Sequence, residues 1–482
     1  MEDFDLNLVA KKSVKSIFAL VSRTFLIQVL SIVASLVLTI FLSPANFGVF
    51  FIVSSIVVFL NYFSDIGLAA SLIQKKEEPT TKELRTTFTV QQLLVLMLII
   101  PGFLLSGRIT DFFHLDSSGH FLFIAFLISF LLSSLKTIPT ILLERRLDFH
   151  RLVLPQIGES LVYNGALIIF AIAGWGVASF TIAVLSRGIV GLLLMYAVQP
   201  WPIGIHFDRT IFRRLISFGL PFQLNSLLAL FKDDFINVYI GKILPLTQVG
   251  YIGFAQKWAF LPLRLILDNV IKIIFPSFSR LQHDEKALGV VLEKSLFMIA
   301  FFIFPTAVGF IMLSPFFIEF IPKYQKWEPA VLSLTFFSLN SVFGSLTTPL
   351  TNFLNAIGKV RITLYLMIFW TTITWILTPL FIKVFGFVGV SLASFLVSVS
   401  TLIVLVFVRR YVRFSFVLPI YKQFIAALLM MIFIYFSRVM IVSLPLLLFN
   451  AFLSSVFYLG ILMLLAKTEL LSAARFIRSN IS

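Results

Sequence analysis

The chain has 482 residues, of which 59% are apolar and only 12% are charged. Soluble globular proteins carry about 45–50% apolar and about 25% charged residues, so a water-soluble core could not hide this many apolar side chains. The sequence contains no cysteine, which excludes disulfides, thiolate metal sites and a cysteine nucleophile. Its five histidines are scattered and do not pair at the spacing of metal ligands. The composition predicts an all-α polytopic membrane protein.

Apolar runs long enough to cross a bilayer, about 20 residues each, recur along the whole chain. We predict fourteen transmembrane helices, at 17–42, 47–73, 87–107, 119–143, 153–173, 176–198, 216–240, 249–276, 291–313, 329–355, 360–382, 386–408, 419–441 and 443–465. The spans 216–240 and 249–276 differ from the others in carrying several charged residues. Near the C-terminus, Glu469–Arg478 has apolar residues at helical spacing, which predicts a helix on the membrane surface.

The basic residues indicate how the chain is oriented. With the N-terminus inside, the alternate segments assigned to the cytoplasm hold 25 of the 38 lysines and arginines, and the outside loops hold 5. Cytoplasmic loops of membrane proteins are enriched in these residues. The asymmetry predicts that both ends of the chain are cytoplasmic, and it accounts for the net charge of +16 without a nucleic-acid partner.

Two short segments with the same pattern indicate an internal repeat. Leu42–Phe50 joins the first two predicted helices and Leu244–Ile252 joins the seventh and eighth; each has a proline, a polar residue and then an apolar–glycine–apolar restart. The glycines of these restarts are Gly48 and Gly250. Parallel repeats of this kind occur in transporters, with the substrate site near the bilayer midplane. The predicted domains are a six-helix lobe at 1–198, a second at 199–408, and two further helices with a cytoplasmic tail at 409–482.

Ionisable residues inside the predicted spans are the candidates for a functional site. Each costs about 2.5–3.5 kcal/mol at a helix centre on insertion scales, so it usually faces a polar cavity or a partner. Among the acids, Asp65 could cap or pair near its helix end, and Glu159 could bond Tyr163 one turn on. The candidate substrate-binding cations of a central cavity are Arg23, Lys136, Arg187, Lys232, Lys257 and Arg264. The candidates for ion coupling or ion pairing are Asp65, Glu159, Asp233, Asp234 and Asp268.

Depth in the bilayer separates the cations. Arg187 lies eleven residues from each end of the span 176–198. Snorkelling from there would need roughly 15 Å, which is too far for one side chain. We expect Arg187 to face a cavity or to pair with an acid from another helix. Arg23 and Lys136 lie nearer the cytoplasmic face, where snorkelling to water competes with a position in the cavity.

The span 249–276 carries a polar stripe. Lys257, Arg264 and Asp268 are seven and four residues apart, which at about 100° per residue places them within about 40° of one another on a helix. Arg264 and Asp268 can pair at i, i+4, and Pro262 predicts a kink because it removes a backbone hydrogen bond. Two interpretations stay open: a cationic cleft that holds a pyrophosphate, or an ion network with the preceding helix.

The motifs of common membrane enzymes and nucleotide-binding proteins are missing. The sequence lacks G-x-x-x-x-G-K-[ST], H-E-x-x-H and G-x-S-x-G. Its longest loops are about fifteen to twenty residues on the span lengths assumed, whereas a glycosyltransferase or polymerase would show a sizeable soluble domain or loop. We therefore predict a transporter without cofactor or metal rather than an enzyme.

Five short segments, in order along the chain, resemble oligosaccharide flippases of the Wzx type. They are Asp65–Gln74, Leu143–Phe149, Ile274–Gln282, Asn352–Lys359 and Gly386–Ser391. The chain looks most like exporters of lipid-linked capsule, colanic-acid or O-antigen repeats, within the multidrug/oligosaccharidyl-lipid/polysaccharide superfamily. The resemblance implies a two-lobed fold, an undecaprenyl-pyrophosphate-linked oligosaccharide substrate and alternating access across the bacterial inner membrane, driven by an ion gradient. As partners it implies membrane lipids, a polysaccharide polymerase and a chain-length regulator.

Three alternative functions remain. A lipid II flippase would carry a denser set of arginines in its first helix, where this chain has only Arg23. An ion-coupled multidrug exporter needs no site for an anionic headgroup, so the excess of intramembrane cations argues against it. A membrane-embedded ligase or polymerase is the third alternative, and the short loops argue against it.

Overall fold

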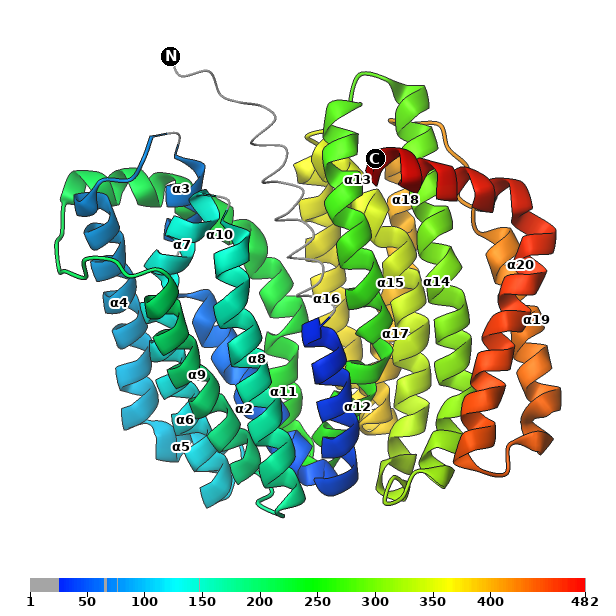
Figure 1. Ribbon diagram of the computed structural model, residues 1–482, viewed down its shortest axis with the longest axis horizontal. Helices are drawn as coiled ribbons and strands as arrows, with labels where there is room; N and C mark the ends of the chain where they lie inside the picture. Colours follow the sequence, from blue (N-terminus) through cyan, green and yellow to red (C-terminus); the bar gives the residue numbers. More distant parts are fainter. Residues whose placement is uncertain (1–25, 65–66, 76, 147, 482) are drawn as a thin grey trace. The chain divides into compact units, whose positions relative to one another are not determined.

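The computed structural model describes residues 26–64, 67–75, 77–146 and 148–481, and all regular structure within these ranges is helical (Figure 1). The chain forms two compact units, the first ending at Gly250 and the second beginning at Tyr251. The predicted division into lobes at 198 and 408 stays a prediction.

The first unit contains a helix at Leu26–Phe41 and the helices α2 to α11. Their bounds are α2 (Pro44–Tyr62), α3 (Leu68–Gln74), α4 (Thr81–Leu104), α5 (Ser106–Phe112), α6 (Ser117–Leu135), α7 (Thr137–Arg145), α8 (Phe149–Ile172), α9 (Ala178–Val198), α10 (Arg209–Asp233) and α11 (Phe235–Ile243). The boundary between the units falls within α12 (Leu246–Ala259).

The second unit continues with helices that include short 3-10 and π segments, labelled η. Their bounds are η1 (Leu263–Leu267), α13 (Asp268–Arg280), α14 (Glu285–Phe320), η2 (Gln325–Ala330), α15 (Val331–Ala356), α16 (Val360–Phe385), α17 (Val388–Ser400), η3 (Thr401–Ile403), α18 (Val404–Val408), α19 (Tyr421–Ser437), η4 (Arg438–Met440) and α20 (Leu444–Ile481). After Ala466, whose φ and ψ are not helical, the rest of α20 turns away from its first part (Figure 1).

Each of the fourteen predicted spans overlaps a helix of the structure. Eleven helices among the described residues are long and apolar enough to cross a membrane, and a shorter apolar helix lies at Leu26–Phe41. The other two predicted spans, 216–240 and 249–276, are broken in the structure, into α10 and α11 and into α12, η1 and α13. The predicted spans 47–73 and 119–143 are also divided, into α2 with α3 and into α6 with α7. The all-α, multi-pass membrane fold is confirmed, and about fourteen crossing helices agree with it.

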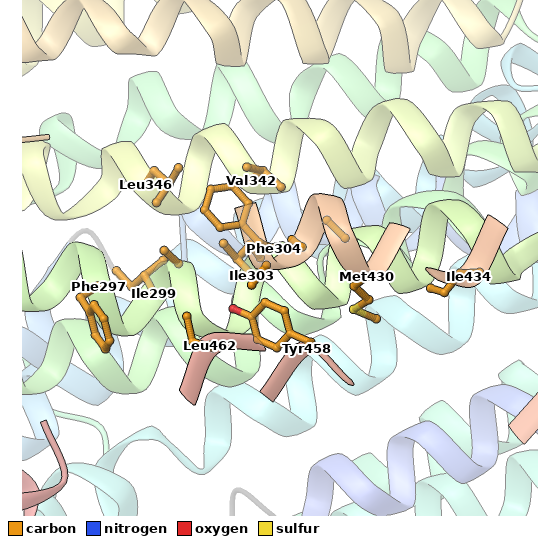
Figure 2. Packing of buried hydrophobic residues seen from close by; sticks show 14 of the residues in the cluster. Phe297, Ile299, Ile303, Phe304, Val342, Leu346, Met430, Ile434, Tyr458 and Leu462 are labelled. Atoms are coloured by element: carbon orange, nitrogen blue, oxygen red, sulfur yellow. The ribbon is translucent and has the colours of Figure 1, made fainter. Parts of the chain in front are cut away.

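The core of the second unit forms around α14, which packs against α13, α15, α19 and α20. Figure 2 shows apolar side chains of α14 meeting those of α15, α19 and α20. The hydroxyl of Tyr458, which is 2% exposed, donates to the carbonyl of Phe301 at 3.0 Å. The last two membrane helices are therefore packed onto α14 by van der Waals contact between apolar side chains and by this hydrogen bond, two of the interactions that hold helices together in lipid.

The two turns that indicated a repeat lie against each other within the first unit. A Cβ atom on Gly48 would lie 1.9 Å from the carbonyl oxygen of Leu246, and one on Gly250 would lie 1.8 Å from the carbonyl oxygen of Pro44. Each glycine therefore touches the backbone four residues before the other glycine. The contact is reciprocal, as expected for two equivalent segments related by a two-fold axis.

Arg145 fixes the segment between α3 and α4. This segment lies at one end of the first unit, the end that we expect to face the cytoplasm. Its guanidinium donates to four backbone carbonyls, those of Leu72, Ile73, Lys75 and Glu77, the last at 2.8 Å. Two of the segments that carry the family resemblance, Asp65–Gln74 and Leu143–Phe149, are therefore joined by this side chain.

Beside that contact, Glu83 forms a buried ionic cluster at the start of α4. The side chain of Glu83 is 4% exposed, and its carboxylate accepts from Lys75 Nζ at 2.9 Å and pairs with Arg214 of α10. Glu83 also caps the helix with Thr80, whose backbone N–H donates to it at 2.8 Å. A capping box of this kind satisfies the free N–H groups of the first helical turn.

Candidate functional site

A polar cavity of about 710 Å³ lies within the first unit, between α6, α7, α8, α9 and the helix at Leu26–Phe41. A smaller cavity of about 250 Å³ lies next to it and reaches α2. Five residues line both cavities: Ser133, Lys136, Glu159, Tyr163 and Arg187. Three of them are candidates that the sequence analysis selected for their charge, so the structure brings Lys136, Glu159 and Arg187 together.

Lys136 is held at a break between α6 and α7. Pro139 lacks an N–H group, so the carbonyl of Leu135 four residues earlier has no partner within the helix. Instead, the hydroxyl of Tyr196 on α9 donates to that carbonyl at 3.0 Å. The hydroxyl in turn accepts from Trp201 Nε1 at 3.1 Å. The position of Lys136 therefore depends on a side chain of another helix that satisfies the broken turn.

Tyr196→Phe removes this donor and is expected to destabilise the protein by about 1–3 kcal/mol, because the carbonyl of Leu135 would stay unpaired. The measurement is the thermal melting of purified protein in detergent. Tyr365→Phe is the matched control, since Tyr365 is 68% exposed. Equal melting temperatures for the two variants would contradict the role of Tyr196.

Glu159 on α8 lies between two cations. Its Oε1 accepts from Lys136 Nζ at 2.5 Å, and its Oε2 lies 3.5 Å from Arg187 Nε. The side chains of Lys136 and Glu159 are each 12% exposed, whereas that of Arg187 is 56% exposed. The carboxylate is therefore bound closely to a buried lysine and loosely to an arginine that is open to the cavities.

A glycine of α9 makes room for the carboxylate. A Cβ atom on Gly191 would lie 2.2 Å from Glu159 Oε1 and 2.5 Å from its Cδ. Helices α8 and α9 pack along their lengths (Figure 1), and Gly191 is the point where the side chain of Glu159 passes between them. Any larger residue at 191 would push Glu159 out of its present position.

Arg187 lies near the middle of α9, as its place in the predicted span indicated. Its guanidinium carbon lies 5.7 Å from the centre of the Tyr163 ring, a contact that favours a cation over the ring face. The prediction left a cavity-facing position and an ion pair open for Arg187, and the structure has both. Glu159, by contrast, bonds Lys136 and not Tyr163 one turn away.

The shared cluster has an excess of positive charge, since Lys136 and Arg187 face the single carboxylate of Glu159. A second acid, Glu144 of α7, lines only the larger cavity. Burial raises the pKa of the Glu144 carboxyl above its ordinary value, which favours its neutral form. The rest of the polar lining is made of hydroxyl and amide groups: Ser31, Thr137, Thr140, Gln156, Ser160 and Asn164.

The candidates of the seventh predicted span are on α10 and its junction with α11. Lys232 Nζ pairs with the adjacent Asp233 at 2.5 Å. Asp234 lies at the junction itself, where its backbone carbonyl accepts from Asn237 N at 3.0 Å. None of the described lining residues of the two cavities belongs to α10 or α11, so Lys232, Asp233 and Asp234 are not part of that site.

The eighth predicted span is irregular near Pro262, where a kink was expected. The α-helix α12 ends at Ala259, and a π-helical turn follows at Leu263–Leu267. Lys257 and Arg264 are both exposed residues in the structure. The side chain of Asp268 is outside the described part of the chain, as are Arg23 and Asp65, so the predicted Arg264–Asp268 pair stays a prediction.

The sequence analysis missed the polar stripe that lines the cavities from α6 and α7, although its spacing was visible. Ser129, Ser133, Thr137 and Thr140 follow one another at intervals of three or four residues in an otherwise apolar span. That spacing puts hydroxyl groups on one face of a helix. It also missed Gly191, whose role depends on a neighbouring helix. Within the described residues, no group of three or more His, Asp or Glu could hold a metal ion.

Solved structures with the same fold are flippases and transporters. The lipid II flippase MurJ, in an inward closed conformation, matches with a TM-score of 0.77 at 18% identity, over 93% of this chain and 99% of that one. An inward-facing multidrug resistance MATE family transporter of the MOP superfamily matches with a TM-score of 0.62 at 18% identity, over 81% and 97% of the two chains. These likenesses define the class of fold.

The family is defined by sequence. The model of the polysaccharide biosynthesis protein family matches residues 37–332, which is more than half of the chain. The protein belongs to this family. It is 24% identical over 396 residues to the lipopolysaccharide biosynthesis protein WzxC of Escherichia coli (strain K12), covering 80% of this chain and 78% of that protein. It is 26% identical over 303 residues to the succinoglycan biosynthesis transport protein ExoT of Rhizobium meliloti (strain 1021), covering 61% and 56%. The resemblance to Wzx-type flippases is confirmed.

Proposed function

We propose that the protein is a flippase that moves undecaprenyl-pyrophosphate-linked oligosaccharide repeat units from the cytoplasmic to the periplasmic leaflet by alternating access. The repeat units serve the synthesis of a surface polysaccharide, such as capsule, exopolysaccharide or O-antigen. One observation carries the proposal: a polar cavity with a net positive cluster, Lys136, Glu159 and Arg187, lies between α6, α8 and α9, which have the length and composition of membrane-spanning helices.

The cavity has the chemistry that such a headgroup requires. Lysine and arginine bind phosphate oxygens through charge-assisted hydrogen bonds, and these are stronger away from water. The hydroxyl and amide groups around the cluster can exchange hydrogen bonds with sugar hydroxyls. A volume of about 710 Å³ is within the usual range of about 300–1,000 Å³ for small-molecule sites.

The cellular setting is part of the proposal. We place the protein in the bacterial inner membrane with both termini in the cytoplasm, because the basic residues are concentrated in the segments assigned to that side. We also propose that it makes and breaks no covalent bond, and that a polysaccharide polymerase and a chain-length regulator act next to it on the translocated units.

The charge of the site favours this substrate over cationic drugs, which the excess of positive charge in the cluster would repel. Lipid II presents the same pyrophosphate as a polysaccharide precursor, so the cation cluster does not separate these two substrates. The names of the sequence relatives WzxC and ExoT refer to polysaccharides, which favours the polysaccharide precursor.

The test is reconstitution of the purified protein in liposomes that contain fluorescently labelled lipid-linked repeat units. A membrane-impermeant quencher is expected to reach the inner-leaflet label faster than in protein-free vesicles. Equal quenching in both would overturn the proposal. Faster quenching with labelled lipid II alone would instead establish the lipid II alternative, and transport of a cationic dye alone would establish the drug exporter.

A deletion strain tests the same proposal in cells. Loss of the surface polysaccharide, with lipid-linked repeat units trapped on the cytoplasmic side, is the expected result. Normal polysaccharide with increased drug sensitivity would contradict it.

A further inference from the structure

Glu159 occupies the place where an anionic ligand of the two cations would bind. Its carboxylate oxygens face Lys136 Nζ at 2.5 Å and Arg187 Nε at 3.5 Å, and both cations line the same two cavities. A carboxylate resembles a phosphate in its charge and in its acceptor oxygens. A phosphate that enters the site therefore meets cations that already have an anion between them.

The two cations differ in access. The side chain of Arg187 is 56% exposed, so an anion in either cavity can contact it without displacing Glu159. The side chain of Lys136 is only 12% exposed and its ammonium group is bonded to Glu159. An entering phosphate therefore meets, at Lys136, an ammonium group that already donates to the carboxylate of Glu159 and must share it or replace the carboxylate.

Charge counting gives the same result. The pyrophosphate of a lipid-linked sugar is a diester with two negative charges near neutral pH, and Lys136 with Arg187 carries two positive charges. The charge of Glu159 is one negative charge too many when the substrate is bound. An unbalanced charge at low dielectric is costly, so Glu159 weakens the binding of the pyrophosphate.

We propose that Glu159 is an internal competitor of the substrate's phosphates for Lys136 and Arg187, which keeps the affinity low enough for the pyrophosphate to be released. The inference rests on the proposed function and assigns a specific part of it to this residue. A transport site must bind strongly enough to load and weakly enough to unload, and a built-in anion that takes back the lysine provides the second property. Gly191 is the positioning residue, because only the absence of a Cβ there lets Glu159 lie between the cations.

Among the described residues that line both cavities, Glu159 is the one acid that can compete with a phosphate for Lys136 and Arg187. From the described lining of the two cavities the other titratable groups are Lys136 at the α6–α7 break, Glu144 on α7, Tyr163 on α8 and Arg187 on α9. Glu144 lines only the larger cavity and is outside the shared cluster. The helix at Leu26–Phe41 and α2 contribute apolar, hydroxyl and amide side chains to the lining, without a charge.

The test measures binding of farnesyl-pyrophosphoryl-N-acetylglucosamine, a short-chain pyrophosphate diester, to the purified full-length protein by titration calorimetry. Glu159→Gln is expected to bind the probe at least tenfold more tightly than the wild type at the same pH and salt. In the liposome assay the same variant is expected to reach half-saturation at a lower substrate concentration and to have a lower maximal rate. A residue needed only for folding would not produce this combination.

Two further variants complete the test: one displaces the carboxylate of Glu159, and the other removes a negative charge outside both cavities. Gly191→Ala retains the charge of Glu159 but displaces its carboxylate, so it is expected to tighten binding in the same direction, by a smaller factor. Glu78→Gln removes one negative charge from an exposed residue outside both cavities and is expected to leave the affinity unchanged. Gly191→Ala also serves as the decisive variant if Glu159→Gln does not fold.

The outcomes separate this inference from the proposed function. If the wild type binds the probe and neither Glu159→Gln nor Gly191→Ala binds it more tightly, the competitor role is wrong and the flippase proposal stands. If neither the folded wild type nor folded Glu159→Gln binds the pyrophosphate probe, both are overturned.

Discussion

Alanine at Gly48 or at Gly250 is expected to lower the thermal stability of the protein more than any other glycine-to-alanine change described for the chain. The new methyl group would lie 1.9 Å or 1.8 Å from a backbone carbonyl oxygen, and a backbone cannot move aside as a flexible side chain can. Overpacking typically costs about 1–3 kcal/mol, and a clash with backbone belongs at the upper end of that range or above it. A loss of that size is a large fraction of the stability of an ordinary domain, about 5–15 kcal/mol.

The measurement is melting of the purified variants in the same detergent, together with their yield from membranes. The matched controls are Gly309→Ala in α14 and Gly460→Ala in α20, where an added Cβ meets nothing within 4 Å. Alanine is also the better helix former, so these controls are expected to melt at or slightly above the wild type. A Gly250→Ala protein that melts with the controls would show that the backbones at Gly48 and Gly250 do not approach as closely as the structure has them.

Lys136→Ala is expected to reduce flipping of the labelled lipid-linked repeat unit by roughly 100-fold or more, and to do so more strongly than Arg187→Ala. Removing Lys136 deletes a proposed ligand of the phosphate and leaves Glu159 as a buried charge without its close partner, a change that costs about 3–5 kcal/mol in comparable pairs. Arg187→Ala removes a half-exposed charged donor, worth about 1.5–3 kcal/mol, and Glu159 keeps Lys136.

The measurement is the initial rate in liposomes, normalised to the amount of folded protein. Lys383→Ala, an exposed cation at the end of α16, is the control and is expected to transport at the wild-type rate. The double variant Lys136→Ala with Glu159→Gln is expected to transport faster than Lys136→Ala alone, because it no longer holds a charge that repels the phosphate. Equal rates for the single and double variants would mean that the two residues are not coupled.

Much of the fold could be predicted because the lipid bilayer imposes one simple rule, a run of about 20 apolar residues for each crossing. The rule found most of the helical segments, with α6 and α7 as one span, but not α5, which lies almost entirely between two predicted spans. It did not predict the break between α6 and α7. Pro139 indicates that the carbonyl of Leu135 loses its partner within the helix, but it does not indicate which neighbouring side chain replaces that partner. That neighbour, Tyr196, is on another helix.

The candidate site was predictable only in part. Charge and depth selected Lys136, Glu159 and Arg187, because an ionisable group inside a span needs a partner or a cavity. Sequence spacing then suggested Tyr163 as the partner of Glu159, since residues four apart share a helix face. The actual partner, Lys136, is 23 residues away in the chain, and periodicity carries no information about which faces of different helices meet.

The repeat illustrates what a local pattern can and cannot reveal. Gly48 and Gly250 were singled out because their turns look alike, and similarity alone did not indicate that they touch. The reason for glycine at both positions is the reciprocal approach of two backbones, which becomes visible only when the elements are placed in space.

The hydrogen bond between Tyr196 and Leu135 has a consequence for how the protein is made. The acceptor, the carbonyl of Leu135, leaves the ribosome 61 residues before its donor, Tyr196. The segment that contains α6 and α7 is therefore made before the side chain that satisfies this carbonyl. A carbonyl without a hydrogen-bond partner is costly in lipid. We therefore expect this segment first to lie straighter, or less deep in the bilayer, than it does in the finished protein. We therefore expect the break at Lys136 to take its final form only after α9 has been made, and α9 also supplies Arg187, the last member of the charged cluster.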